Sequence, residues 1–86
     1  MTGVTPARRI LVEYFALFRE MAGCDKEFIK TDAVDASALY REIQERHALA
    51  LDPGRMKVAI NDEFSAWDTP LTDGDRVVFI PPVAGG

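Results

Sequence analysis

The sequence predicts an α+β fold in which one mixed sheet of four to five strands packs on a single main helix and runs into a flexible C-terminal tail. Three observations support this prediction. Runs of β-branched and aromatic residues at 9–15 and 75–80 are typical of strands. Residues 35–47 repeat apolar side chains at the spacing of an amphipathic helix. The composition, 48% hydrophobic and 28% charged, is that of an ordinary globular domain.

The N-terminal part is predicted to form a strand, a short helix and a second strand. In the strand at 9–15 alternate side chains face opposite sides, which places Phe15 on the face opposite Tyr14. Residues 16–23 read as two helical turns that end in a glycine, as many helices do. Residues 26–31 alternate weakly and are predicted to return along the first strand, after a connection longer than a tight turn.

Residues 35–47 are predicted to form the main helix, with Asp35 capping its first turn. One stripe at helical spacing is expected to face the sheet: Ala36, Leu39, Tyr40, Ile43 and His47. The charged residues off that stripe are expected in solvent: Arg41, Glu42, Glu45 and Arg46. His47, the single histidine, is therefore expected to pack half-buried rather than to act as a base or a metal ligand.

Turn residues divide the C-terminal part into three strands. Asp-Pro-Gly at 52–54 precedes a strand at 56–61, and a short irregular strand follows at 63–67. Thr-Asp-Gly at 72–74 precedes the last strand. The resulting order of strand, helix, strand, helix and three strands is the layout of the ubiquitin-like β-grasp fold, in which the first and last strands lie parallel at the centre of the sheet.

The chain is predicted to have three parts: a flexible N-terminal arm at 1–8, the β-grasp domain at 9–80 and an extended Gly-Gly tail at 81–86. No apolar run approaches the roughly 20 residues needed to span a membrane, and the N-terminus does not read as a signal peptide. The single cysteine, Cys24, excludes an internal disulfide framework and fits a reducing cytoplasm. We therefore expect a cytoplasmic protein.

Recognised catalytic and metal-binding motifs are not found in the sequence. It has no Gly-rich phosphate loop, no paired cysteines or histidines at metal-ligand spacing and no nucleophile elbow. Nothing near Cys24 in the sequence would activate its thiol, and Trp67 is expected to be a core or rim aromatic. The acidic pairs Asp62–Glu63 and Asp73–Asp75 flank turns, where Asp is favoured for backbone reasons.

The net charge of −4 bears on the kind of partner. An acidic domain suits nucleic acid poorly, because that binding depends on neutralising phosphates. It suits a partner protein with a basic surface, although plain solubility explains the same charge equally well.

The last strand is apolar on both of its faces. Val77 and Phe79 point one way, while Val78 and Ile80 point the other. One main helix covers only one face of a sheet. We therefore expect an exposed apolar surface at three positions, Phe15, Phe64 and Ile80, of the kind that marks a binding site. The alternative is that a second helix or a loop covers this face.

The ending FIPPVAGG suggests a tail that enters another protein. Pro81 and Pro82 favour a stiff, extended exit from the sheet. Gly85 and Gly86 lack a Cβ, so a narrow channel can grip their backbone and a reagent can approach the carbonyl. Six residues reach about 20 Å when extended, enough to enter a deep pocket. The chemistry is therefore expected at the terminal carboxylate, once it is activated as an acyl-adenylate; the alternative is a tail without function.

Two segments carry a family resemblance. Residues 14–23 read YFALFREMAG, and residues 70–86 read PLTDGDRVVFIPPVAGG. In these segments, and in the spacing between them, the chain resembles the MoaD family of small sulfur-carrier subunits of molybdopterin synthase, within the ubiquitin-like ThiS/MoaD group. Gly-Gly alone is shared with ubiquitin and with thiamine-pathway carriers, whereas Asp-Gly-Asp followed by Pro-Pro-Val is much narrower.

The resemblance implies a specific chemistry. A MoeB-like enzyme uses ATP to adenylate the terminal glycine, here Gly86, and sulfur delivery then gives a C-terminal thiocarboxylate. The tail formed by Pro81, Pro82, Val83, Ala84 and Gly85 enters the active site of the large subunit, MoaE, where two tails supply the sulfurs that convert precursor Z to molybdopterin. This implies a heterotetramer with the active-site side chains on the large subunit, no metal and no permanently bound cofactor. The family's docking surface falls on Phe15, Phe64 and Ile80. Two other functions remain open: a sulfur carrier for thiamine or a thio-nucleoside, and a protein modifier conjugated to lysines.

Overall fold

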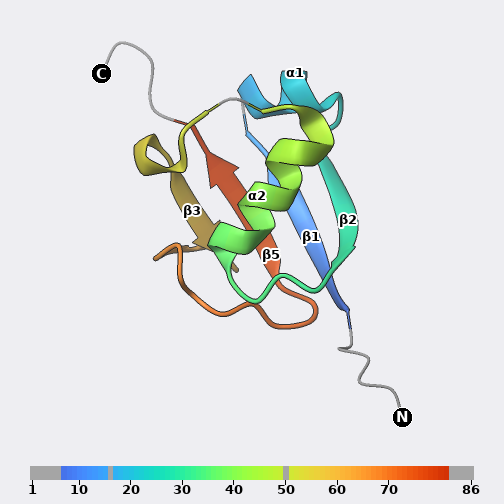
Figure 1. Ribbon diagram of the computed structural model, residues 1–86, viewed down its shortest axis with the longest axis vertical. Helices are drawn as coiled ribbons and strands as arrows, with labels where there is room; N and C mark the ends of the chain where they lie inside the picture. Colours follow the sequence, from blue (N-terminus) through green and yellow to red (C-terminus); the bar gives the residue numbers. More distant parts are fainter. Residues whose placement is uncertain (1–6, 16, 50, 82–86) are drawn as a thin grey trace.

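The computed structural model describes residues 7–15, 17–49 and 51–81 (Figure 1). Its elements follow the predicted order: β1 (Arg8–Tyr14), α1 (Leu17–Ala22), β2 (Lys26–Thr31), α2 (Ala36–His47), a 3-10 helix (Pro53–Arg55), β3 (Lys57–Ile60), β4 (Glu63–Ser65) and β5 (Arg76–Ile80). Most bounds lie within one residue of the prediction. The short strand β4 ends two residues early, because the chain turns there and the Thr69 amide donates to the Ala66 carbonyl.

The five strands form one sheet in the order β2-β1-β5-β3-β4. The central strands β1 and β5 run parallel, with Tyr14 beside Phe79, and the other neighbouring strands are antiparallel. This is the mixed β-grasp sheet that the sequence predicts. Because β1 and β5 are parallel, both strands end at the same edge of the sheet (Figure 1).

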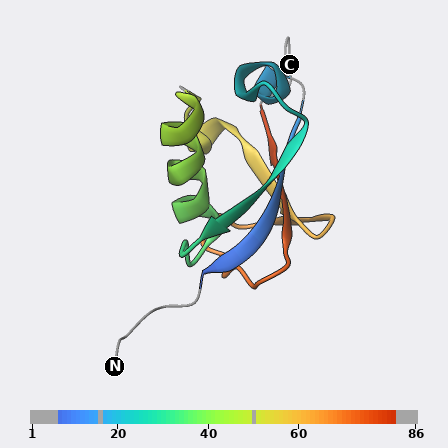
Figure 2. The ribbon, with the colours of Figure 1, turned by 90° about the vertical axis from the view of Figure 1, so that its right-hand side faces the viewer.

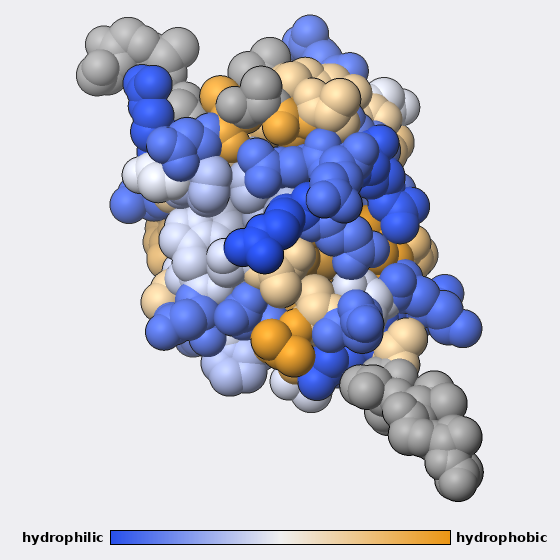
Figure 3. Space-filling view, viewed as in Figure 1, coloured by the Kyte–Doolittle hydropathy of each residue, from blue (hydrophilic) through white to orange (hydrophobic). Residues whose placement is uncertain are grey.

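Helix α2 covers one face of the sheet and closes the core (Figure 2). Tyr40 is the largest fully buried side chain, and its ring lies 5.1 Å from that of Phe79. Trp67 stacks on Phe79 from the rim, as predicted. The remaining core side chains of β1, β5 and α2 are Ile10, Val12, Tyr14, Val77, Ala36, Leu39 and Ile43. The outer side of α2 is hydrophilic (Figure 3).

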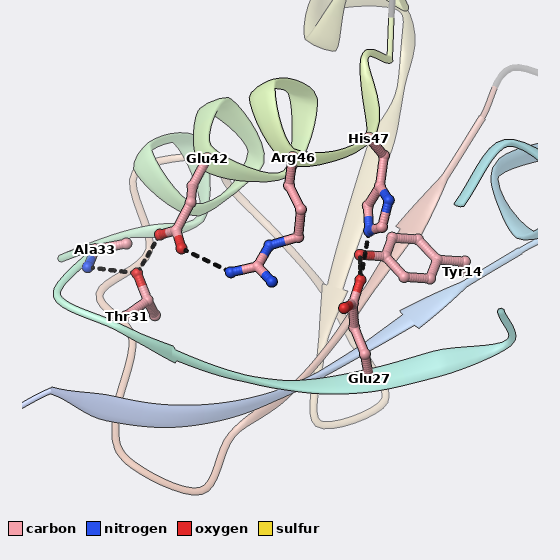
Figure 4. A network of polar contacts seen from close by, with 7 residues as sticks. All are labelled: Tyr14, Glu27, Thr31, Ala33, Glu42, Arg46 and His47. Atoms are coloured by element: carbon pink, nitrogen blue, oxygen red, sulfur yellow. Dashed lines mark hydrogen bonds and ion pairs between the residues drawn. The ribbon is translucent and has the colours of Figure 1, made fainter. Parts of the chain in front are cut away.

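Polar contacts fix both ends of α2 and correct one prediction. The Asp35 carboxylate accepts the Ala38 amide at 2.8 Å, which is the expected N-terminal cap. Ala48 ends the helix in a left-handed conformation, with its N–H donating to the Gln44 carbonyl. Glu42, expected in solvent, is instead half-buried, and it accepts a 2.5 Å hydrogen bond from the Thr31 hydroxyl (Figure 4). The expectation was wrong because β2 ends directly beside this turn of the helix.

The acidic residues around the last turn have the backbone role that was predicted for them. Asp73 accepts the Arg9 amide and Asp75 accepts the Thr72 amide, while Gly74 takes the left-handed φ of 92° that the turn requires. The Arg9–Asp73 bond joins the turn before β5 to β1, and the Thr72–Asp75 bond closes the turn itself. These hydrogen bonds account for the carboxylates of Asp73 and Asp75 without a bound ligand.

The face of the sheet opposite α2 carries no helix among the described residues (Figure 2). Helix α1 lies at the end of the sheet and turns Phe18, fully buried, into the main core. The alternative that a second helix or a loop covers this face is therefore wrong for the part of the chain that the structure describes, where Phe15 and Phe64 stay exposed. We call this side of the sheet the open face.

Candidate docking surface

The three residues predicted for docking are all at the surface. The side chain of Phe15 is 57% exposed and that of Phe64 is 73% exposed, while Ile80 is half-buried. Pro81, the last described residue, is also half-buried. The rest of the predicted threading segment and its reactive end, Pro82 to Gly86, lie outside the described residues.

The strand register brings these positions onto one apolar band. Phe15 follows Tyr14, which pairs with Phe79, so Phe15 and Ile80 lie at the same end of neighbouring strands. Toward the other edge, Val78 pairs with Ala59, and Ala59 pairs with Phe64. The docking patch is defined here as Phe15, Ala59, Phe64, Val78 and Ile80. It lies on the open face, and β5 leads from it directly to Pro81.

Charged residues border the docking patch. Arg76 bridges two carboxylates, lying 3.5 Å from Glu13 on β1 and in closer contact with Asp62 in the β3–β4 turn. Lys57 pairs with Ile80 across β3 and β5. Exposed pairs of this kind contribute little stability. An apolar centre with a charged rim is the usual anatomy of a protein-binding surface.

Sequence reasoning did not single out two residues of the open face. Ala59, which is buried, completes the band beneath Phe64 and Val78, and only the strand register shows it. Phe28 is 64% exposed on β2, opposite Leu11. The alternation of residues 26–31 could have indicated that Phe28 is exposed. Neighbouring side chains of a strand face opposite sides, and Ile29 is buried in the core.

On the helix side, β1, β2 and α2 share a polar cluster (Figure 4). The Tyr14 hydroxyl donates to Glu27 at 2.5 Å, and His47 Nε2 lies 2.6 Å from the same carboxylate oxygen. Burial raises the pKa of Glu27, but hydrogen bonds from Tyr14 and His47 outweigh it and hold that pKa below its usual value. His47 is half-buried and lies edge-on to Tyr14, which confirms its predicted packing role. The cluster ties α2 to the sheet.

Cys24 is half-buried, and its surroundings disfavour the thiolate. Its burial, followed by the nearby charges of Glu27 and Asp25, raises the pKa of the thiol, which keeps it protonated. Within residues 7–15, 17–49 and 51–81, no group of three potential metal ligands is found. No described helix is long and apolar enough to cross a membrane. The docking patch is the candidate functional feature that the sequence predicted and that the strand register brings together.

Comparison with known proteins decides the family. The ThiS family matches residues 12–86. The chain belongs to the ThiS family. The molybdopterin synthase sulfur carrier subunit of Escherichia coli K12 is 41% identical over 80 residues, covering 90% of this chain and 99% of the relative. Its counterpart in Haemophilus influenzae is 35% identical over 78 residues, 87% of this chain and 96% of the relative. These relatives confirm the resemblance that the motifs indicated.

Solved structures agree with this ThiS-family assignment. A molybdopterin converting factor subunit 1 from Pyrococcus furiosus is 34% identical with a TM-score of 0.73, covering 88% of this chain and 99% of that one. A complex of subunits 1 and 2 of the molybdopterin-converting factor from Helicobacter pylori is 33% identical with a TM-score of 0.63, covering 91% and 99%. The modifier protein SAMP1 of Haloferax volcanii, at 23% identity and a TM-score of 0.74 over 91% and 99%, shows the shared fold alone.

Proposed function

We propose that this ThiS-family protein is the sulfur carrier subunit of a molybdopterin synthase. One observation carries the proposal: relatives named as that subunit are up to 41% identical and align over nearly their whole length. The surface supports it, because the apolar docking patch, exposed at Phe15 and Phe64 and half-buried along β5, leads to the segment that begins at Pro81. A carrier needs such a docking surface beside its reactive end, and it needs no catalytic side chains of its own.

The chemistry is assigned to the carboxylate of Gly86. A MoeB-like partner would use ATP to form the acyl-adenylate at this carboxylate, with release of pyrophosphate. Sulfide-level sulfur would then attack the adenylate carbonyl, so that a C–S bond forms as the C–O bond to AMP breaks, and a thiocarboxylate is left. Because Gly85 and Gly86 have no Cβ, the partner can approach the reacting carbonyl closely. The covalent sulfur would be the only group that the chain carries.

The docking patch is assigned to the large subunit, MoaE. The Helicobacter pylori neighbour was solved as a complex of its subunits 1 and 2, which supports a large-subunit partner here. The patch would fix the small subunit while residues 81–86 enter the active site of the large one. Two small and two large subunits would form the synthase, and the side chains that act on precursor Z would belong to the large subunit.

Reconstitution tests this function. The purified chain would be incubated with a MoeB-like enzyme, ATP and a sulfur donor, and then with a large subunit and precursor Z. We expect the intact mass to rise by the exchange of one oxygen for sulfur, and molybdopterin to form. Loading without molybdopterin would indicate a carrier for another pathway, such as thiamine or a thio-nucleoside. Conjugates on lysines of other proteins would indicate a modifier.

A further inference from the structure

The outer edge of β2 carries a second feature of the open face. Lys26, Phe28 and Lys30 alternate along this edge strand and share one face, and Phe28 is the exposed apolar residue between the two lysines. The guanidinium carbon of Arg9 lies 4.8 Å from the centre of the Phe28 ring. We call these four residues, Arg9, Lys26, Phe28 and Lys30, the basic edge.

The charges of the basic edge are not compensated within the described structure. Arg9 lies directly opposite Lys30, and like charges in that position repel each other. Lys26 lies opposite Glu13, but the Glu13 carboxylate is 3.5 Å from Arg76. No ion pair in the described ranges includes Arg9, Lys26 or Lys30. Local positive charge of this kind is unexpected in a chain with net charge −4, and an acidic ligand would relieve it.

The three β2 residues of the basic edge also have backbone N–H and C=O groups that point outward. The Tyr14 amide donates to the Asp25 carbonyl at 2.8 Å, which makes this a hydrogen-bonded cross-strand pair. Antiparallel ladders alternate such pairs with non-bonded ones. Lys26, Phe28 and Lys30 fall on the non-bonded positions, so their N–H and C=O groups point away from β1. A strand edge in this state is a template for an added strand.

We propose that the basic edge binds an extended acidic segment of a partner protein, added as a strand along β2. Side chains directly across from Lys26, Phe28 and Lys30 would alternate on the same face, so the segment would read acidic, any, apolar, any, acidic. Main-chain hydrogen bonds would supply affinity, and the three side-chain contacts would supply selectivity. The Glu13–Arg76 pair lies between this site and the docking patch, so both could be occupied together.

The same charges argue against two other occupants. A second copy of this chain would set lysine against lysine across the new ladder, which is a recognised way to prevent edge-to-edge pairing. A nucleic acid would be attracted by the three cationic residues but repelled by the acidic remainder of the domain. An acidic peptide is attracted by the positive charges of the basic edge, and it also forms hydrogen bonds with the outward N–H and C=O groups of β2.

A labelled peptide tests the proposal. The probe is fluorescein-Ser-Glu-Thr-Phe-Thr-Glu-Ser, and the matched control has Gln in place of both Glu residues. In fluorescence anisotropy titrations of the full chain, we expect the Glu peptide to bind at least about tenfold more tightly than the Gln peptide, and salt to weaken it. In NMR spectra of the chain, the changes in backbone amide chemical shift on adding the Glu peptide should be largest along residues 26–30.

Variants locate the site. Lys30→Glu and Phe28→Ala should each weaken binding about tenfold, while Phe64→Ala on the docking patch should not change it. Both altered side chains on β2 are exposed, and melting curves would confirm that the variants fold. Equal binding of the two peptides, or loss of binding in Phe64→Ala alone, would overturn the proposal. The proposal would also be overturned if a labelled oligothymidylate bound the chain in a way that depends on Lys30 while the Glu peptide did not bind.

Discussion

At the residue scale, Ile80 stands where the domain ends and the tail begins. It is half-buried beside Lys57, on the opposite face of β5 from the core residue Phe79. Ile80→Asp should therefore leave the fold intact, yet in the proposed complex it would bury a charge within the docked apolar patch. We expect affinity for that subunit to fall roughly tenfold or more by isothermal titration calorimetry.

The matched control for Ile80→Asp is Val34→Asp. Val34 is 62% exposed and lies in the β2–α2 loop, away from the docking patch. This control should bind the large subunit with unchanged affinity. If Ile80→Asp instead unfolds the domain in a thermal melt, then Ile80 belongs to the core, and the assignment of the docking patch is wrong.

Glu27 gives a residue-scale prediction on pH. Its pKa is lower in the folded protein than in the unfolded chain, so the carboxylate stabilises the fold above its usual pKa of about 4.3. That contribution is lost as pH falls through the lower, folded value. We expect Glu27→Gln to lower the melting temperature most at neutral pH, with the difference shrinking below about pH 4.

Thermal melts from pH 7 to pH 3 would check the Glu27 prediction. Glu45→Gln makes the same change of net charge at an exposed position of α2 and serves as the control. A Glu27→Gln protein whose difference from wild type grows as the solution is acidified would contradict the assigned direction of the pKa shift.

For single residues, alternation along a strand predicted which side chains are exposed or buried better than charge did. It placed Phe15 and Ile80 outside and Val77 and Phe79 inside, because side-chain direction follows from the backbone alone. It could not show that Glu42 would accept the Thr31 hydroxyl, since that contact depends on where α2 crosses β2. Ala59 was missed for the same reason: its place in the docking patch comes from the register of three strands.

At the element scale, α2 depends on its N-terminal cap. The Asp35 carboxylate accepts the Ala38 amide, and the helix supplies the largest part of the core opposite the sheet. Asp35→Ala should lower the free energy of unfolding by about 1 kcal/mol. Urea denaturation would measure this. Asp32→Ala, an exposed loop change of the same type, should stay within about 0.5 kcal/mol of wild type, and equal losses in both variants would contradict the capping role.

The elements themselves were largely predictable, and their contacts less so. The helix at 35–47 and the strands at its two sides follow from hydrophobic periodicity and turn residues. The position of α1 does not: its sequence indicates two helical turns but not that it closes the end of the sheet and leaves the open face uncovered. That choice is made by Phe18, which packs edge-on against Tyr40 in the core.

At the scale of the whole molecule, the two faces of the sheet differ: α2 covers one, and the two proposed recognition sites lie on the other. The face under α2 holds the core, and the open face holds the docking patch toward β4 and the basic edge along β2. Under the proposed function, the chain would meet an activating enzyme and a large subunit in turn. A domain that keeps recognition on one face can exchange such partners without disturbing the contacts that stabilise it.

The terminus is where the proposed function places all of the chemistry, so its length should be critical. Deleting Gly86 draws the reactive carboxylate back by about 3.3 Å, whereas reaction requires atoms about 3–3.5 Å apart. We expect the deletion to fold normally and bind the large subunit, but to form almost no molybdopterin in the reconstituted assay. Deleting Thr2 shortens the chain equally at the other end, outside the residues matched by the family, and should preserve the rate. Product formation by the Gly86 deletion at close to the normal rate would move the chemistry elsewhere and end the carrier proposal.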